Sequence, residues 1–480
     1  MTLPDLIEII PLKKPVYAEI RVPGSKSITN RALILAALAN GKTKLKGALW
    51  SEDTQIMVEA LENLGFKIIV EPDPIEFCNR TITVVGRGGK VPKGGKTKVL
   101  AKEIFVGNAG TAARFLAAFV CLGKGYYRLF GVPRMHQRPQ KDLFKAIAIP
   151  EKLPLLQRLF NNFLFSQASL RSLGYEIEST DEKLPVTIRG SGPKRGAKCD
   201  VSIEESSQFA SALLLCKEAG GWEINILGEN SEESPYVFMT SKLIEKFPKN
   251  GGIFQIEPDA SSGSYFWAVG WLFPATDSME EQSQGISRYD LSLFMRGKIT
   301  HNKFFSVRVS HWPRSDWQID QWFPALLSEP PDFPGTTSRI SHMGDSIMTA
   351  ITVAAFAHKP CKFTDLGRLR VQETERVVAL RTELTKCGAK VVEEGDTLTV
   401  WPSPLHGAEI ETYNDHRMAM CFAILGLKVP GIKIKNPACV KKTFPNFFQK
   451  LAAQSPHGLD AAILDAKSGR KLEFKELFAD

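Results

Sequence analysis

Hydrophobic and polar positions follow a helical period along much of this chain, beginning close to its first residues. Apolar side chains recur at helical spacing over residues 28–39, directly after a turn made by Pro23 and Gly24. Ser25 or Ser27 can cap the first turn, because a serine hydroxyl accepts hydrogen bonds from free backbone N–H groups. The pattern therefore predicts a helix that begins near residue 26.

Three later segments share one pattern, an amphipathic helix that ends at a glycine and leads directly into an apolar strand. They are residues 57–70 (MVEALENLGFKIIV), 170–177 (LRSLGYEI) and 379–392 (ALRTELTKCGAKVV). Such self-similarity indicates a module that is repeated along the chain. We therefore expect an α/β fold built from copies of one helix–strand unit.

The second copy of this unit is interrupted. Residues 142–146 should continue directly into Leu170, but residues 147–169 intervene, and their apolar positions follow helical spacing. This predicts an added amphipathic helix that packs on the body of the protein or on another subunit. Residues 274–334 are rich in Trp, Pro, Asp and Ser and should form long loops, while the charged segment after residue 455 carries no recognisable motif.

The composition is that of a globular protein with more than one domain. The chain has 480 residues, of which 43% are hydrophobic and 24% charged, so two or three domains are expected. The FPKNGG stretch at 247–252 marks a plausible boundary, and residues 12–22 link the start of the chain to the opening helix. A net charge of +9 favours anionic partners, which could be nucleic acid, a membrane surface or small phosphorylated metabolites.

Other features narrow this choice. The basic residues are scattered apart from short clusters such as Lys441-Lys442, so a nucleic-acid-binding tail is not supported. Eight cysteines show no CxxC pair and no histidines at zinc spacing, which indicates reduced, buried thiols. The N-terminal stretch lacks a signal-peptide core, and no apolar run approaches membrane-spanning length. We therefore expect a cytoplasmic protein without a membrane segment.

Several predicted helix starts carry groups that favour anions, because the backbone N–H groups and the positive end of the helix dipole already attract negative charge. Lys26 and Arg31 flank the first helix start. The other stretches are VGNAGTAARFL (106–116, with Asn108, Gly110, Thr111 and Arg114), GVPRMHQRP (131–139, with Arg134 and Arg138), SSQFAS (206–211), YNDHRMAM (413–420, with Asn414 or Asp415 as cap before His416 and Arg417) and KKTFPNFF (441–448, with Lys442).

Two acidic residues lie among these cations. Asp345 in HMGDSIMTA and Glu373 in RVQETER are candidates for general acid or base catalysis. The GxxxxGK[ST], GxGxxG, HExxH and GxSxG motifs are absent, which argues against nucleotide hydrolysis, dinucleotide redox chemistry, zinc hydrolysis and serine esterase chemistry.

Together these stretches resemble the 3-phosphoshikimate 1-carboxyvinyltransferases, or EPSP synthases. The matching motifs occur in the family's order, and the resemblance covers most of residues 13–450: PGSKSITNRAL (23–33), GNAGTAARFL (107–116), GVPRMHQRP (131–139), SSQFASALL (206–214), DASSGSYFWA (259–268), RVQETERV (370–377), TYNDHRMAMCFA (412–423) and KTFPNFF (442–448). The resemblance implies a two-domain inside-out α/β barrel with three βαβαββ units in each domain. It places residues 22–254 in one lobe, residues 1–21 and 255–450 in the other, and residues 451–480 in a C-terminal tail.

The resemblance also implies a reaction, transfer of the enolpyruvyl group of phosphoenolpyruvate to the 5-hydroxyl of shikimate 3-phosphate, without metal or cofactor. The partners would be these two small molecules and no nucleic acid or membrane, and the protein would be a monomer. Asp345, Glu373 and Lys26 would be catalytic. The implied substrate-binding residues are Lys26, Ser27, Arg31, Asn108, Gly110, Arg138, Ser206, Ser207, Gln208, Ser234, Asp345, Gln372, Arg376, Arg417 and Lys442.

This chain departs from the family pattern in places. Gln372 stands where the family often has Lys, and Phe115 replaces the usual Pro after Arg114. Ser234 lies one residue before Pro235, whereas the family's Ser lies two before it. Two other readings are open: the sister transfer to UDP-N-acetylglucosamine, which YNDHRMAM and the SSQ segment disfavour, and a non-catalytic anion-binding relative.

Overall fold

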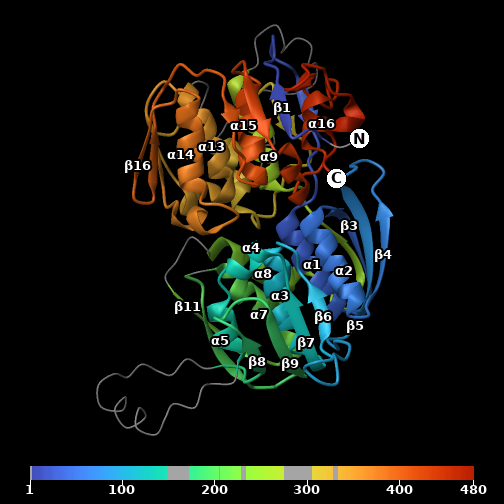
Figure 1. Cartoon of the computed structure of the whole chain (residues 1–480). Coiled ribbons are helices and arrows are strands. Elements are labelled where there is room, and N and C mark those ends of the chain that lie inside the picture. The colour runs from blue at the N-terminus through green and yellow to red at the C-terminus, as the bar shows by residue number, and fades with distance from the viewer. Residues whose placement is uncertain (1–2, 149–171, 205, 229–233, 275–304, 328–332) are drawn as a thin grey trace, which may run out of the picture.

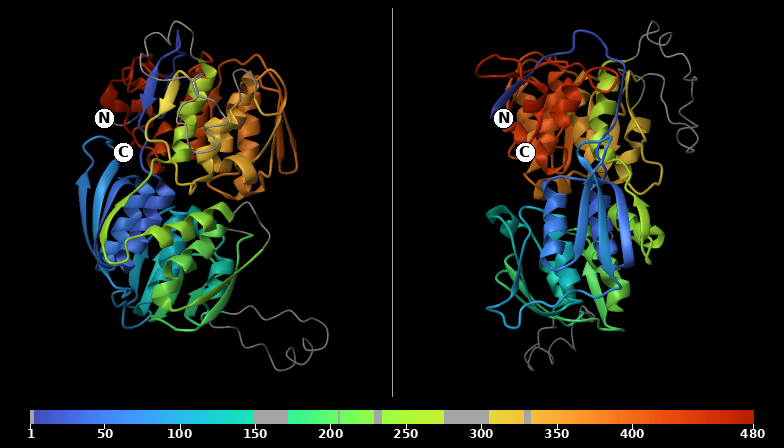
Figure 2. Two further views of the ribbon diagram at one scale, coloured as in Figure 1. Left: turned by 180° about the vertical axis from the view of Figure 1, so that it is seen from behind. Right: turned by 90° about the vertical axis from the view of Figure 1, so that its right-hand side faces the viewer.

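The computed structural model describes residues 3–148, 172–204, 206–228, 234–274, 305–327 and 333–480. The chain forms two lobes, and both chain ends lie at the same one (Figures 1 and 2). One cluster of buried apolar side chains draws on residues 28–256, which we call the first lobe. The other cluster draws on residues 3–22 and 265–479, which form the second lobe. The chain therefore starts in the second lobe, builds the first, and returns.

Four sheets share a single strand order, in which the first two strands are parallel and each later strand is antiparallel to its neighbour. In the first lobe they are β12 (Gly252–Gln255), β3 (Asn40–Leu49), β5 (Asn79–Arg87) and β4 (Lys67–Pro72), and β6 (Lys102–Phe105), β7 (Lys124–Phe130), β9 (Val186–Ser191) and β8 (Glu176–Ser179). In the second lobe they are β14 (Thr336–Ser338), β15 (Cys361–Thr364), β17 (Thr397–Val400) and β16 (Val391–Glu394), and β18 (Glu409–Ile410), β19 (Ile432–Lys435), β1 (Leu6–Ile9) and β20 (Ile463–Asp465).

A smaller parallel pair completes each lobe among the described residues. The pairs are β10 (Lys198–Ser202) with β11 (Glu223–Leu227) in the first lobe, and β13 (Val307–Val309) with β2 (Ala18–Ile20) in the second. The shared strand order shows that the sheets are copies of one unit, as the repeated sequence pattern predicted. The predicted mixed α/β fold class is confirmed.

The helices lie inside each lobe and the sheets outside, as Figures 1 and 2 show. Every residue of α9 is buried, because the sequence ASSGSYFWAVGWL has no charged face to present to water. The helices of the first lobe are α1 (Lys26–Leu38), α2 (Glu52–Asn63), α3 (Gly110–Val120), α4 (Pro133–Gln137), α5 (Lys141–Ile147), α7 (Ser207–Gly220) and α8 (Ser234–Lys246). Those of the second are α9 (Ala260–Leu272), α12 (Phe323–Leu326), α13 (Ile347–Val353), α14 (Arg376–Lys386), α15 (His416–Gly426) and α16 (Phe447–Ala452).

Short helical turns connect several of these elements in the second lobe. They are η3 (Ile319–Trp322), η4 (Arg339–Met343), η5 (Gly344–Ser346), η6 (Ala354–Phe356), η7 (Gly367–Val371), η8 (Pro437–Lys442) and η9 (Phe474–Leu477). The predicted helix at residue 26 is confirmed as α1, and the predicted helix–strand pairs at 57–70 and 379–392 are confirmed as α2 with β4 and α14 with β16. No described helix combines the length and apolar character that a membrane span requires.

The interruption of the second unit leaves and rejoins the fold at one place. Helix α5 ends at Ile147, and the backbone N–H groups of Leu173 and Tyr175 donate to the carbonyl oxygens of Ala146 and Ile147, each at 2.8 Å. The helix and strand of this unit are therefore joined despite the interruption. The added helix predicted within 147–169 falls almost wholly outside the described residues, and so does much of the 274–334 region.

The segment after residue 451 differs from the predicted tail. Strand β20 pairs with β1 as the edge of a sheet, and Leu459, Ile463 and Leu477 are buried in the second-lobe core. Its apolar residues are too widely spaced to give a helical or strand period, so the sequence pattern did not reveal their packing. The segment is part of the second lobe.

Two chain segments cross between the lobes side by side. The Ser25 N–H donates to the Glu257 carbonyl and the Asp259 N–H donates to the Pro23 carbonyl, each at 2.8 Å. A separate contact joins the lobes at Glu76, a buried first-lobe residue that accepts from Asn446 at 2.8 Å and Lys450 at 2.6 Å. These contacts join the two lobes.

Candidate active site

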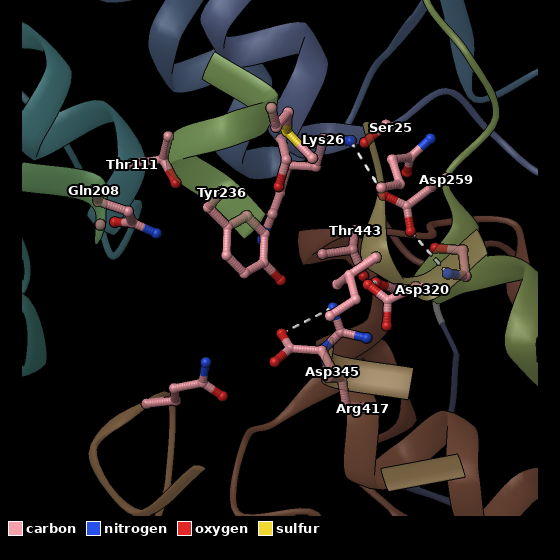
Figure 3. A pocket seen from close by; sticks show the side chains of 18 of the residues that line it. Ser25, Lys26, Thr111, Gln208, Tyr236, Asp259, Asp320, Asp345, Arg417 and Thr443 are labelled. Atoms are coloured by element: carbon pink, nitrogen blue, oxygen red, sulfur yellow. Dashed lines mark hydrogen bonds and ion pairs between the residues drawn. The ribbon is translucent and has the colours of Figure 1, made fainter. Parts of the chain in front are cut away.

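A cleft opens between the lobes, and side chains from both line it. In Figure 3, Thr111 and Gln208 lie across this cleft from Asp320, Asp345 and Arg417, with Tyr236 between them. The structure brings most of the predicted residues together here: the cleft is lined by Lys26, Ser27, Arg31, Gly110, Arg138, Ser207, Gln208, Asp345, Gln372, Glu373, Arg376 and Arg417.

The other predicted residues lie behind this lining or at its edge. Asn108 accepts from Arg138 through its carbonyl oxygen, and Lys442 contacts Glu373. Ser206 is buried and caps α7, its hydroxyl accepting from the Gln208 N–H at 3.3 Å. Ser234 is the first residue of α8, and its side chain falls outside what the structure describes.

Lys26 stands at the first position of α1 and points into the cleft. Its ammonium group lies 3.1 Å from a carboxylate oxygen of Asp53, which follows β3 at the start of α2. Ser25 occupies the N-cap position without a side-chain cap, and the Lys26 N–H instead donates to Asp259 at 3.3 Å. Because Asp259 also caps α9 by accepting from the Ser262 N–H, one carboxylate serves helix starts in both lobes.

Arg31 is buried one turn further along α1. Its Nε donates to the Thr240 hydroxyl at 2.7 Å, and its two terminal nitrogens donate to the Ser27 carbonyl at 2.9 Å and the Ser211 hydroxyl at 3.2 Å. The guanidinium lies over the Phe115 ring, 5.2 Å from its centroid. Phe115, a departure from the family pattern, therefore supports Arg31 by a cation–π contact.

Gly110 allows Arg138 to approach the N-terminus of α3. A Cβ atom on Gly110 would lie 2.9 Å from the Arg138 guanidinium carbon, closer than the two groups can pack. The glycine thus lets a positive side chain stand directly over the first N–H groups of the helix. This combination of a cation and a helix N-terminus is a built anion site.

Gln208 is oriented by Arg114, a buried residue of α3. Arg114 donates to the Gln208 amide oxygen and, at 3.2 Å, to the Pro139 carbonyl, and its guanidinium lies over the Phe209 ring. The Gln208 side chain is therefore held facing the cleft rather than left to rotate.

On the second-lobe wall, Asp345 lies among three guanidinium groups. Its carboxylate oxygens are 3.0 Å from Arg339, 3.3 Å from Arg417 and 3.8 Å from Arg376. Burial by itself would raise the pKa of Asp345, but Arg417, Arg339 and Arg376 together hold that pKa well below its usual range. Asp345 is therefore a carboxylate at neutral pH.

Glu373 is held in a similar way. Its oxygens lie 3.1 Å from the Lys442 ammonium and 2.9 Å from Arg376. Burial opposes ionisation here, yet Lys442, Arg376 and Arg138 lower the pKa of Glu373 well below its usual value. Burial lowers the pKa of Lys442, but the Glu373 and Asp53 carboxylates together raise it above its ordinary value.

Arg376 begins α14 and ties this wall to α15. Its Nε and one terminal nitrogen donate to the buried Asp415 at 2.7 and 3.2 Å, and Asp415 caps α15 by accepting from the Arg417 N–H at 2.9 Å. This confirms the predicted cap at YNDHR. Burial and then the Lys26 charge lower the pKa of His416, so its imidazole is neutral near pH 7.

Gln372, where the family often has Lys, connects the two walls. Its amide oxygen accepts from Arg376, and its backbone carbonyl accepts from Arg134 of the first lobe at 3.3 Å. A neutral amide at this position adds no positive charge to the second-lobe wall.

Several cleft residues were not predicted from the sequence. They are Asp53, Tyr236, Asp259, Asp320, Arg339 and Arg368. Asp53 and Asp259 each follow a strand at a helix start, so the criterion that found Lys26 could have found them if it had included acids. Asp320 lies within the irregular region 274–334 and Arg339 shortly after it, and neither carries a sequence signal of that kind. Among the described residues, no group of three or more His, Cys, Asp or Glu side chains could hold a metal ion.

Comparison with known proteins gives a consistent result. A family model described as EPSP synthase (3-phosphoshikimate 1-carboxyvinyltransferase) matches residues 11–148, 166–250 and 248–451. The 3-phosphoshikimate 1-carboxyvinyltransferase of Nostoc punctiforme is 32% identical over 480 residues, covering 93% of this chain and 98% of the relative. That of Laribacter hongkongensis is 34% identical over 458 residues, covering 90% of this chain and 96% of the relative.

Two groups of solved structures share the fold. An EPSP synthase from Acinetobacter baumannii has a TM-score of 0.61 at 20% identity, covering 95% of this chain and 99% of that one. The enolpyruvyl transferase NikO from Streptomyces tendae has a TM-score of 0.57 at 14% identity, covering 98% of this chain and 99% of that one. At these identities the likeness concerns the fold.

Proposed function

This chain belongs to the EPSP synthase family, and from that premise we infer how its cleft carries out enolpyruvyl transfer. The reaction joins the enolpyruvyl group of phosphoenolpyruvate to the 5-hydroxyl of shikimate 3-phosphate and releases phosphate. Both substrates carry a phosphate and a carboxylate, so the site must neutralise several negative charges. The observation that carries the assignment is the cleft itself, where helix starts with cations face two ionised carboxylates, Asp345 and Glu373.

The first-lobe wall is suited to shikimate 3-phosphate. Arg31, Ser27 and Ser207 face the cleft near the starts of α1 and α7 and offer cationic and hydroxyl donors to a phosphate. Ser206 supports this group by capping α7, and Gln208 is held where the two substrates would meet. We also assign Ser234, the first residue of α8, to this set.

Phosphoenolpyruvate would lie between the walls. Arg138 over the start of α3, Lys26, and the Arg376, Arg417 and Lys442 cations surround that part of the cleft. We assign Asp345 to accept the 5-hydroxyl proton while Glu373 gives a proton to the methylene carbon, so that the 5-oxygen bonds to the substituted carbon. Loss of phosphate and of a methyl proton from that tetrahedral intermediate then yields the enol ether.

Glu373 must carry a proton before it can donate one, and substrate binding changes its pKa. In the free cleft, Lys442 and Arg376 hold it ionised, and a carboxylate cannot donate a proton. A bound phosphate would share those cations and raise the pKa of Glu373 toward the range of a general acid. Asp345 would stay ionised, because it keeps Arg339 at 3.0 Å, a guanidinium that is not among the cations assigned to phosphoenolpyruvate.

The assignment is tested by mixing the purified protein with shikimate 3-phosphate and phosphoenolpyruvate and following phosphate release, with mass spectrometry of the product. We expect release with an enolpyruvyl adduct of shikimate 3-phosphate, and none above background from Asp345→Ala. Replacing shikimate 3-phosphate by UDP-N-acetylglucosamine should give no adduct. An adduct with the nucleotide sugar, or no release from either pair, would overturn the assignment.

We propose a monomer that works in the cytoplasm, with lobes formed by residues 22–254 and by residues 1–21 with 255–450. The packing of β20 adds the later residues to the second lobe. Size-exclusion chromatography with light scattering checks the monomer, and limited proteolysis checks the lobe limits.

A further inference from the structure

Asp320 lies in the cleft close to Asp345, although neither the sequence motifs nor the proposed roles include it. It belongs to η3, in the segment SDWQID, and only 4% of it is exposed. It lines the same cavity as Asp345, and Figure 3 shows the two carboxylates on the same side of the cleft. A buried carboxylate that has no assigned role therefore lines the cleft together with the proposed base.

Both oxygens of Asp320 act as hydrogen-bond acceptors. One accepts from the Ser346 backbone N–H at 2.6 Å, and the other accepts from the Ser261 hydroxyl at 2.8 Å. Within the described ranges, no Lys or Arg nitrogen lies within 4.0 Å of this carboxylate. Asp320 therefore contacts the residue that follows Asp345 and, through Ser261, the start of α9.

The turn that presents Asp345 packs directly on Asp320. Gly344 has φ +49° and ψ −131°, a conformation that favours glycine. A Cβ atom at Gly344 would lie 3.1 Å from each Asp320 oxygen and 2.6 Å from the Ile319 side chain. Because the turn Gly344–Ser346 rests on η3 and is bonded to it, the position of Asp320 determines where the Asp345 backbone lies.

The charges around Asp320 come from several elements. Asp345 on η5 and Arg417 on α15 act on its carboxyl most strongly, while Arg339 on η4 and Tyr236 on α8 face the same group of carboxylates. Burial and the Asp345 charge raise the pKa of Asp320 to about 6, although Arg417 and the bonds from Ser346 and Ser261 oppose the shift. Asp320 thus changes protonation in a range where enzymes are assayed.

We propose that Asp320 is a positioning residue, which holds the turn Gly344–Ser346 so that the Asp345 carboxylate faces the substrate hydroxyl from among its guanidinium neighbours. This role rests on the proposed function and adds a residue to it. Asp320 accepts both hydrogen bonds, from the Ser346 N–H and the Ser261 hydroxyl, when it is ionised. Protonation turns one of its oxygens into a donor facing an N–H or a hydroxyl, and the turn loosens.

The main test is Asp320→Asn, which keeps the size of the side chain but leaves only one oxygen to accept. We expect kcat to fall about tenfold at pH 7.5, since a small misplacement of a reacting group is costly, while both KM values change less than about threefold. The matched control is Asp316→Asn. Asp316 lies on the same segment and bonds only Gln321 among the described contacts, so this variant should keep the wild-type kcat.

The pH profile separates positioning from a general loss of packing. Wild-type kcat should fall as the pH drops through about 6 and Asp320 takes up a proton, and Asp320→Asn should lack that component. Both substrates carry phosphates that titrate near pH 6, so the comparison is between variants at saturating substrate. Ser261→Ala removes a donor that lowers the pKa of Asp320, and its acid limb should therefore move to higher pH.

Hydrogen exchange gives a readout that does not depend on turnover. The Ser346 amide should exchange faster in Asp320→Asn than in Asp316→Asn or the wild type, because its acceptor is weakened. If the wild type released no phosphate from its two substrates, the proposed function would fail. The exchange rates would still test whether Asp320 holds the turn Gly344–Ser346. An Asp320→Asn protein with the kcat, pH profile and Ser346 exchange of Asp316→Asn would overturn the proposal, as would an unshifted acid limb in Ser261→Ala.

Discussion

The two walls of the cleft surround their cations with different chemistry. On the first-lobe wall, Arg31, Arg114 and Arg138 donate hydrogen bonds to hydroxyl, amide or carbonyl oxygens. On the second-lobe wall, Arg376 and Lys442 form ion pairs with buried or nearly buried carboxylates. Lys26 is the exception on the first-lobe wall, since it faces Asp53.

This difference suits the two walls to different roles. Neutral partners orient a guanidinium without consuming its charge, so the first-lobe wall keeps its positive potential for a phosphate. On the second-lobe wall, carboxylate partners lower the net charge. The cations in these pairs keep Asp345 and Glu373 ionised and in fixed places. We therefore propose that the first wall binds shikimate 3-phosphate and that the second wall transfers protons, while cations of both walls hold phosphoenolpyruvate.

The largest effect should come from removing the acid on the second-lobe wall. Glu373→Gln keeps the shape of the side chain but cannot exchange a proton with the methylene carbon, so kcat should fall about 10³-fold. Phosphate release at saturating substrates measures it. A loss of less than about tenfold would show that Glu373 is not the group that moves this proton.

A pair of arginine substitutions compares the walls through stability. Arg376→Ala leaves Asp415 buried without its partner, which should cost about 3–5 kcal/mol in free energy of unfolding. Arg138→Ala removes one weak bond to a carbonyl at 3.3 Å, so its cost should stay within about 1 kcal/mol. Urea denaturation measures both. Equal costs would contradict the contrast between the walls.

Arg31→Lys tests binding on the first-lobe wall. Arg31 donates in three directions to Thr240, Ser27 and Ser211, a pattern that an ammonium group cannot reproduce. We expect KM for shikimate 3-phosphate to rise about tenfold with kcat changed less than about threefold. A fall in kcat at unchanged KM would place Arg31 in the chemistry instead.

The smallest effect is expected away from the cleft, where the C-terminal segment meets the first lobe. Phe478 packs edge-on against Phe77, with ring centroids 5.2 Å apart. Phe478→Ala should lower the free energy of unfolding by about 1 kcal/mol and leave turnover unchanged. Thermal denaturation and the phosphate assay check the two parts, and a large loss of turnover would show that this contact influences the cleft.

The parts of the site that local pattern encodes were predictable from the sequence. Helix starts, caps and cations depend on a few adjacent residues, and so Lys26, Ser206 and Asp415 were placed correctly on their elements. Partners across the fold were not, because the contacts of Asp53 with Lys26 and of Asp320 with Ser346 arise only when repeated units pack together. The fold class followed from the repeats, whereas the packing of β20 depended on a few widely spaced apolar residues.

The central claim is that shikimate 3-phosphate binding and proton transfer reside on different walls. Calorimetric titration of shikimate 3-phosphate into the wild type and into Glu373→Gln tests it most directly. We predict dissociation constants within about threefold of each other, despite the roughly 10³-fold difference in turnover expected for this variant. Loss of shikimate 3-phosphate binding in Glu373→Gln, in parallel with its loss of turnover, would contradict the account.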